Sequence, residues 1–197
     1  MRTAAVTLAA TLFFSPLASA QSSAAAKPVA PPYQQPAPDP FAGAPAAKPA
    51  DVDSLDHILA ALYDVISGPA GPRDWNRFRS LFLPSGRLTA TGKNPDGSIR
   101  VRALGVDDYA NLAGAGFLKN GFFENAIVNR INTYGQVTQV FSSYESRHNP
   151  GEAPFSRGIN SIQILNDGHR FWIVSILWDS ERPDNPLPKD FTKAPNL

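Results

Sequence analysis

The side chains best suited to chemistry in this chain are few, and they carry oxygen and nitrogen groups, not thiols. The 197 residues include three His and no Cys, which removes thiol nucleophiles, Cys-ligated metals and redox motifs from consideration. The spacing of His57, His148 and His169 matches no metal motif, and neither a glycine-rich phosphate loop nor a nucleophile elbow occurs. We therefore predict no metal and no cofactor.

Acid–base catalysis requires a His or a carboxylate with a suitable pKa, working with a hydrogen-bond donor. Tyr144 is the candidate donor, with Asp179 or His57 as its partner, and Tyr109 is a further candidate. A simpler interpretation of His57 is a surface or packing residue on a helix, because no partner stands beside it in the sequence. These residues leave open whether the protein is an enzyme.

The elements that must position these groups follow from hydrophobic periodicity. Helical spacing predicts helices over residues 52–67, from Trp75 to just before Pro84, and over 106–119. A period of two predicts two short strands and then four longer ones, over 87–91, 99–104, 122–134, 136–148, 157–165 and 170–179. This order predicts an α+β fold: one strongly curved antiparallel sheet with three helices from the N-terminal half over its concave face.

Turn residues indicate which side chains share a face of the sheet. Asp167-Gly168 suits a two-residue hairpin turn, and we place the preceding hairpin turn at Tyr134-Gly135. Because cross-strand partners share a face, we predict a wall of six neutral polar side chains in an apolar cavity. This wall consists of Asn125, Asn129, Ser142, Tyr144, Asn160 and Ser175.

The other face of the last hairpin carries an apolar strip made of Trp172, Val174, Ile176 and Trp178. An exposed strip of this size is costly. We therefore predict that a second copy of the chain or a covering segment lies over it, as in a homodimer formed through the sheet. A one-residue slip in register would exchange the two faces, so the reverse assignment remains open.

The order of elements, the segment "FLPSGRLT" after the Trp75 helix and the late segment "NDGHRFWIVSILWDSE" resemble the NTF2-like superfamily, of the SnoaL-like or DUF4440-like kind. The resemblance covers about residues 52–182. It implies a cone with a pocket between the helices and the concave sheet face, often in a homodimer. Superfamily members include isomerases, dehydratases, hydrolases and proteins with no known catalysis. Its enzymes typically place an Asp or His beside a Tyr in the cavity, and here only Tyr144 matches.

The ends of the chain have a different composition from the middle. Residues 1–20 are typical of a secretory signal peptide cleaved after Ala20, which predicts a periplasmic or secreted protein. Residues 21–51 are rich in Ala and Pro and predict a disordered tether, followed by a domain over 52–183 and a C-terminal tail over 184–197. Without Arg2, 17 basic residues balance 17 acidic ones, which argues against nucleic acid as a partner. We expect no membrane insertion after cleavage.

Three functions are compatible with these features. The first is an exported protein that binds a small, mostly neutral ligand in the cone pocket. The second is an enzyme of the isomerase or dehydratase type that uses Tyr144 with Asp179 or His57. The third is a non-catalytic dimeric interaction module attached to a tether.

Overall fold

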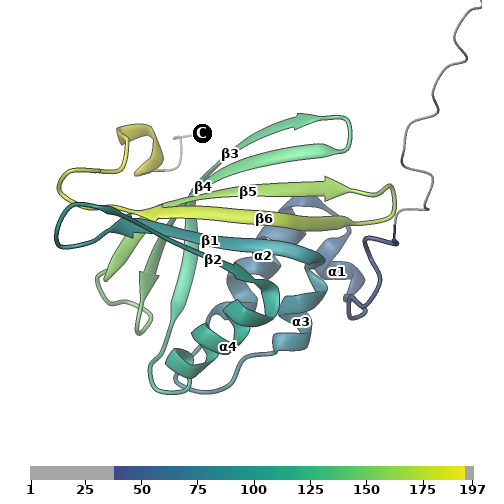
Figure 1. Cartoon of the computed structure of the whole chain (residues 1–197), viewed down its shortest axis with the longest axis horizontal. Coiled ribbons are helices and arrows are strands. Elements are labelled where there is room, and N and C mark those ends of the chain that lie inside the picture. Colours follow the sequence, from purple (N-terminus) through teal and green to yellow (C-terminus); the bar gives the residue numbers. More distant parts are fainter. Residues whose placement is uncertain (1–37, 194–197) are drawn as a thin grey trace, which may run out of the picture. The chain divides into compact units, whose positions relative to one another are not determined.

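The computed structural model describes residues 38–193; the expected signal peptide and most of the expected tether lie outside the described residues. Within the described part, six strands form one curved sheet in the spatial order β2-β1-β6-β5-β4-β3, and the helices lie against one of its faces (Figure 1). This is the α+β architecture predicted from the sequence and implied by the resemblance to NTF2-like proteins.

The helices begin where side chains can accept their first free N–H groups. In α2 (Leu55–Ile66) the Ser54 hydroxyl accepts the His57 N–H at 3.2 Å, and in α3 (Trp75–Ser80) the Asp74 carboxylate accepts the Arg77 N–H at 2.9 Å. Two further helices are α4 (Val106–Phe117) and a single turn, α1 (Pro49–Val52). No helix in residues 38–193 is both long and apolar enough to cross a membrane.

The sheet consists of a hairpin and a four-stranded meander. The hairpin contains β1 (Phe82–Lys93) and β2 (Ile99–Gly105). The meander contains β3 (Phe123–Tyr134), β4 (Val137–Arg147), β5 (Ser156–Asn166) and β6 (Phe171–Ser180). The chain passes through α4 to the far edge at β3, and the meander then brings β6 beside β1 in parallel orientation. The sheet is therefore mixed, which corrects the prediction of a wholly antiparallel sheet.

Two β-bulges determine which side chains face the helices. In β3, Ala126 pairs with Tyr144 while Val128 pairs with Ser143, so Ile127 is an extra residue. In β6, Ile173 pairs with Ile164 and Ser175 pairs with Gln163, so Val174 is likewise an extra residue. An extra residue moves every side chain beyond it to the opposite face of the sheet.

The core lies between the concave face and the helices. Ile162, Ile164 and Ile173 on the sheet and Ile58 and Phe78 on the helices are each at most 1% exposed. Burial of such side chains contributes roughly 1.5–3 kcal/mol each, so this layer holds α2 and α3 in place over the strands.

The packed structure begins earlier than the boundary expected at Val52. Phe41 lies against Trp172 with ring centroids 5.0 Å apart. Asp51, in α1, forms a two-point ion pair with Arg77, with oxygen–nitrogen distances of 2.8 and 2.9 Å. Residues 38–51 therefore pack on the domain, and the tether predicted to extend to residue 51 is wrong for this stretch.

The chain after β6 packs on the outer face of the sheet, the face away from the helices. We call residues 181–193 the C-terminal strap. Its short 3-10 helix η1 (Lys189–Phe191) places Phe191 near Phe141, with ring centroids 6.3 Å apart. The Ser143 hydroxyl donates to the Phe191 carbonyl at 2.8 Å. The tail predicted over 184–197 is thus a packed segment as far as residue 193.

Candidate functional site

A cavity of about 270 Å³ lies between the helices and the concave face of the sheet. Most of its lining is aromatic or aliphatic, and it comes from α2, α3, α4, the strands and the segments that precede β3 and β5. The lining residues are Leu62, Tyr63, Ile66, Phe78, Leu88, Tyr109, Ala113, Phe117, Phe122, Glu124, Tyr144, Ser146, Phe155, Ser156, Asn160, Ile176, Trp178 and Ser180.

Among residues 38–193, Glu124 is the only charged side chain in this lining. The Ser146 hydroxyl, itself 2% exposed, donates to Glu124 Oε2 at 2.7 Å. Burial raises the pKa of Glu124 from 4.5 to about 7, even though the hydrogen bond from Ser146 opposes this rise. At neutral pH both the acid and the carboxylate are therefore populated, which is the condition under which a carboxyl group works as a general acid or base.

Three tyrosines surround the cavity and differ in the partners of their hydroxyl groups. The Tyr63 hydroxyl bonds to Ser142 Oγ at 2.6 Å and accepts from Asn160 Nδ2 at 3.2 Å. The Tyr144 hydroxyl bonds to Ser180 Oγ at 3.2 Å. Tyr109 makes no side-chain hydrogen bond to another described residue. Burial raises the pKa of all three tyrosines, so each remains protonated and can donate at neutral pH.

The position of Tyr144 depends on a missing side chain. Gly158 lies opposite Tyr144 on β5, and a Cβ atom at Gly158 would lie 2.6 Å from the Tyr144 hydroxyl oxygen and 2.8 Å from its ring. Glycine thus leaves the space that the Tyr144 ring occupies above the sheet.

Only part of the predicted polar wall lines the cavity. Tyr144 and Asn160 do so, whereas Ser142 is fully buried beneath Tyr63. Asn125 and Asn129 are exposed, and Ser175 faces outward beside Gln163, so their predicted place in the wall is wrong. For Asn125 and Ser175 the cause is the pair of bulges, which reverse the faces beyond Ile127 and Val174.

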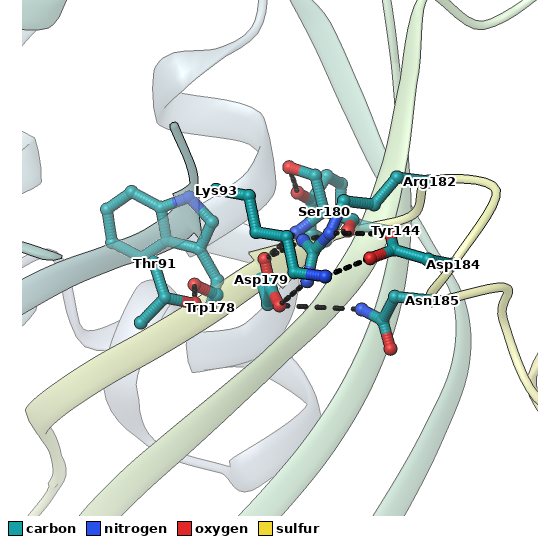
Figure 2. A network of polar contacts seen from close by, with 9 residues as sticks. All are labelled: Thr91, Lys93, Tyr144, Trp178, Asp179, Ser180, Arg182, Asp184 and Asn185. Atoms are coloured by element: carbon teal, nitrogen blue, oxygen red, sulfur yellow. Dashed lines mark hydrogen bonds and ion pairs between the residues drawn. The ribbon is translucent and has the colours of Figure 1, made fainter. Parts of the chain in front are cut away.

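Of the predicted catalytic residues, the structure brings only the tyrosines to the cavity. Asp179 lies next to Ser180 on β6 and points the other way, toward Arg182 and Asn185 (Figure 2). The Arg182 guanidinium, at 2.6 and 3.0 Å from the two carboxylate oxygens, holds the pKa of Asp179 below its usual range. His57 is exposed on α2, and its Nδ1 lies 2.5 Å from Asp53 Oδ1. The pairing of Tyr144 with Asp179 or His57 is therefore wrong.

The predicted apolar strip is divided between different environments. Trp178 lines the cavity and Ile176 is in the core, so both face the helices. Val174 is the bulge residue and is 36% exposed. Trp172 does face outward, and Phe41 and the Arg170 guanidinium, 3.6 Å from its ring centroid, cover it. Phe41 and Arg170 thus cover Trp172, and the four residues do not form one continuous surface.

Glu124 is not among the site residues predicted from the sequence. The available signal is the run Ala126-Ile127-Val128, in which three consecutive apolar residues interrupt the alternation of β3. Such a run is typical of a bulge or of a strand buried on both faces. A hydroxyl group supports the bulge: Ser143 Oγ accepts the Val128 N–H at 3.1 Å.

Comparison with known proteins gives likeness of fold only. No protein-family model and no curated protein matches the sequence. Among solved structures, a Nostoc punctiforme protein of unknown function with a cystatin-like fold aligns with 68% of this chain and 92% of its own, at 12% identity and a TM-score of 0.49.

Two further solved structures are similar to the same degree. An NTF2-like protein of unknown function from Silicibacter pomeroyi has a TM-score of 0.46 at 10% identity and covers 66% of this chain and 94% of its own. An uncharacterised cystatin-like protein from Caulobacter vibrioides has a TM-score of 0.49 at 12% identity, with coverages of 67% and 90%.

Proposed function

We propose that the cavity binds a small, largely apolar molecule and that Glu124 exchanges a proton with it, as in an isomerase or a dehydratase. The observation that carries this proposal is a single carboxyl group with a pKa of about 7 on the wall of an otherwise uncharged cavity. Tuned carboxyl groups in apolar sites are characteristic of general acids and bases.

The remaining lining supports binding of an apolar body. A dry cavity of about 150 Å³ is large enough for benzene, so about 270 Å³ can hold a two-ring molecule. The lining contains no Lys, Arg or His, and an anionic ligand would therefore find no partner there. Tyr109 supplies a hydroxyl that no other described residue occupies, and it is our candidate donor to a ligand oxygen.

The chemistry can be written as a proton transfer. The Glu124 carboxylate takes a proton from a carbon next to a carbonyl group, while Tyr109 donates a hydrogen bond to the carbonyl oxygen. The electron pair of the broken C–H bond moves into the enolate, and Glu124 then returns the proton to the same carbon or to another. No oxidant or second substrate is required.

Hydrogen exchange into 2-tetralone, a two-ring ketone, tests this proposal. In D₂O at pD 7.5 the protein should accelerate loss of the α-hydrogen NMR signals above the buffer rate. The Glu124→Gln variant should lose at least about 100-fold of that acceleration, the usual contribution of a positioned acid or base.

Glu145→Gln is the matched control, because Glu145 lies on neighbouring β4, outside the cavity lining, and pairs with Arg147 at 2.8 Å. This variant should accelerate hydrogen exchange into 2-tetralone as much as the unaltered protein does. Equal exchange by Glu124→Gln and the unaltered protein, or no acceleration by either, would rule out proton transfer by Glu124.

We also propose that the protein acts after export, on the strength of the signal-like residues 1–20. Fractionation of a bacterial host that expresses the full chain should place it in the periplasm or the medium, with an N-terminus at Gln21. Recovery of the uncleaved chain from the cytoplasm would contradict this.

A further inference from the structure

The cavity combines an unusual number of aromatic side chains with one carboxyl group. Eight of its lining residues are aromatic: Tyr63, Phe78, Tyr109, Phe117, Phe122, Tyr144, Phe155 and Trp178. Their rings stand at different angles. The Tyr109 and Trp178 planes are 89° apart with centroids at 6.4 Å, and those of Phe122 and Phe155 are 59° apart at 6.2 Å. Other lining rings stack on one another, Phe78 on Tyr109 at 5.4 Å and Phe117 on Phe122 at 4.7 Å. The cavity is thus bordered by aromatic rings on several sides.

No Lys, Arg or His of residues 38–193 lines this cavity. The Arg73 guanidinium carbon lies 5.1 Å from the Phe117 ring centroid, but Arg73 is not part of the lining. Arg73 is instead held by main-chain carbonyl groups, including those of Ile66 and Gly68 at 2.9 and 2.7 Å. Glu124 therefore faces the cavity without a counter-charge among the described residues.

The groups around Glu124 on its other sides do not supply a counter-charge either. It borders a separate surface hollow whose other charged residues are Asp64, Glu145, Arg147 and Glu152. There Arg147 is bound to Glu145 at 2.8 Å. On the cavity side, the titratable neighbours are the three tyrosines, and these are neutral.

We infer that the ligand of this cavity is an organic cation, with an ammonium or quaternary ammonium group attached to a small apolar body. The negative faces of aromatic rings attract such a group, most strongly when it is removed from water. A positive charge would also offset the cost of burying the Glu124 carboxylate. The inference rests on the proposed function only in taking the cavity as the ligand site, because it requires no proton transfer.

Binding of a cation must be linked to the proton of Glu124. A cation prefers the carboxylate, and the unliganded group holds its proton below about pH 7. If only the carboxylate form binds, the affinity should fall about thirtyfold between pH 8.5 and pH 5.5. Binding at pH 6 should release a proton, which calorimetry detects as a dependence of the heat on the buffer used.

Three probes of similar size separate charge from shape. Phenyltrimethylammonium is the cation, tert-butylbenzene replaces its nitrogen by carbon, and benzoate is an anion. We expect the cation to bind at least about tenfold more tightly than tert-butylbenzene at pH 8.5, and benzoate not to bind. Glu124→Gln should reduce the preference for the cation and remove its pH dependence, whereas Glu145→Gln should retain both.

A second variant covers the case in which Glu124→Gln fails to fold. Trp178→Leu keeps an apolar side chain but removes a ring face, so it should weaken the cation more than tert-butylbenzene. Equal, pH-independent binding of the cation and tert-butylbenzene, or no binding of the cation, would overturn the inference. Binding of tert-butylbenzene with exchange of 2-tetralone would then leave the proposed function intact. A clear preference for the cation without hydrogen exchange into 2-tetralone would instead contradict the proposed proton transfer and leave the inferred cation site intact.

Discussion

Replacement of Glu124 by Gln should change how the stability of the fold depends on pH. Glutamine has the same shape and keeps an oxygen that can accept from Ser146, whose hydroxyl lies 2.7 Å from Glu124 Oε2. The variant therefore removes the titration of one buried group and leaves the packing of the cavity wall nearly unchanged.

The magnitude follows from the displacement of the Glu124 pKa. Between pH 4.5 and about 7 the unfolded chain releases this proton while the folded chain keeps it. The folded state then binds more protons, so its free energy of unfolding falls as the pH rises. The pKa of Glu124 rises from 4.5 in the unfolded chain to about 7 in the folded one. At about 1.4 kcal/mol for each pH unit, the free energy of unfolding therefore falls by about 3 kcal/mol over this range.

Other carboxyl groups act in a different pH range. The pKa values of Asp51 and Asp179 are lowered by their hydrogen bonds to Arg77 and Arg182. Their stabilising contribution is present above about pH 4 and is lost as the pH falls further. They are also unchanged in the variant, so the difference between the two proteins isolates Glu124.

Urea unfolding followed by tryptophan fluorescence, at intervals from pH 4.5 to pH 8.5, measures this difference. We expect the two proteins to be about equally stable at pH 4.5, and Glu124→Gln to be more stable by about 3 kcal/mol at pH 8. Glu145→Gln should follow the unaltered protein. A stability difference that does not vary with pH would refute the reasoning, because it would mean that Glu124 titrates alike in the folded and unfolded chains.

Three further substitutions, two of them with a matched control variant, test individual contacts in the fold. Gly158→Ala places a Cβ 2.3 Å from the Asp179 main-chain carbonyl oxygen and 2.6 Å from the Tyr144 hydroxyl oxygen, and it should destabilise the fold by about 1–3 kcal/mol in urea unfolding. Gly116→Ala, whose Cβ meets no atom within 4 Å, should not destabilise it. Asp51→Asn breaks the two-point ion pair with Arg77 and should lower the free energy of unfolding by about 1–3 kcal/mol. Asp190→Asn removes an exposed ion pair with Arg130 and should lower it by less than about 1 kcal/mol. Ser143→Ala removes the partner of both the Val128 N–H and the Phe191 carbonyl, so amide hydrogen exchange of Val128 should accelerate; unchanged exchange would show that Ser143 does not support the bulge.

The sequence was sufficient to predict α2, α3, α4 and the six strands in their order, but not α1 or η1. Periodicity is local, and residues 106–119 or 157–165, for example, differ from α4 and β5 by no more than two residues at either end. The helices over one face of the sheet follow from the same pattern, because the apolar stripe of α2 and the apolar face of the strands have no other surface to cover.

The face of the sheet on which each side chain lies could not be predicted, because it depends on single extra residues in the strands. At the last turn, Asp167 accepts the N–H groups of both His169 and Arg170, at 2.7 and 2.8 Å. This carboxylate makes a loop longer than the two-residue turn that Asp167-Gly168 predicts. The longer loop and the bulge at Val174 together place Trp178 in the cavity and turn Ser175 away from it.

The bulge in β3 means that the chemistry of the cavity depends on the length of a strand as well as on its composition. Deletion of Ile127 would bring Asn125 to the cavity and carry Glu124 to the outer face, together with the other side chains of β3 before the bulge, without any residue being replaced. The cavity wall would then carry the neutral amide of Asn125 in place of the titratable carboxyl group of Glu124. Two chains with almost identical sequences could therefore differ in whether they move protons at all, and an alignment that treats the gap as trivial would hide the difference.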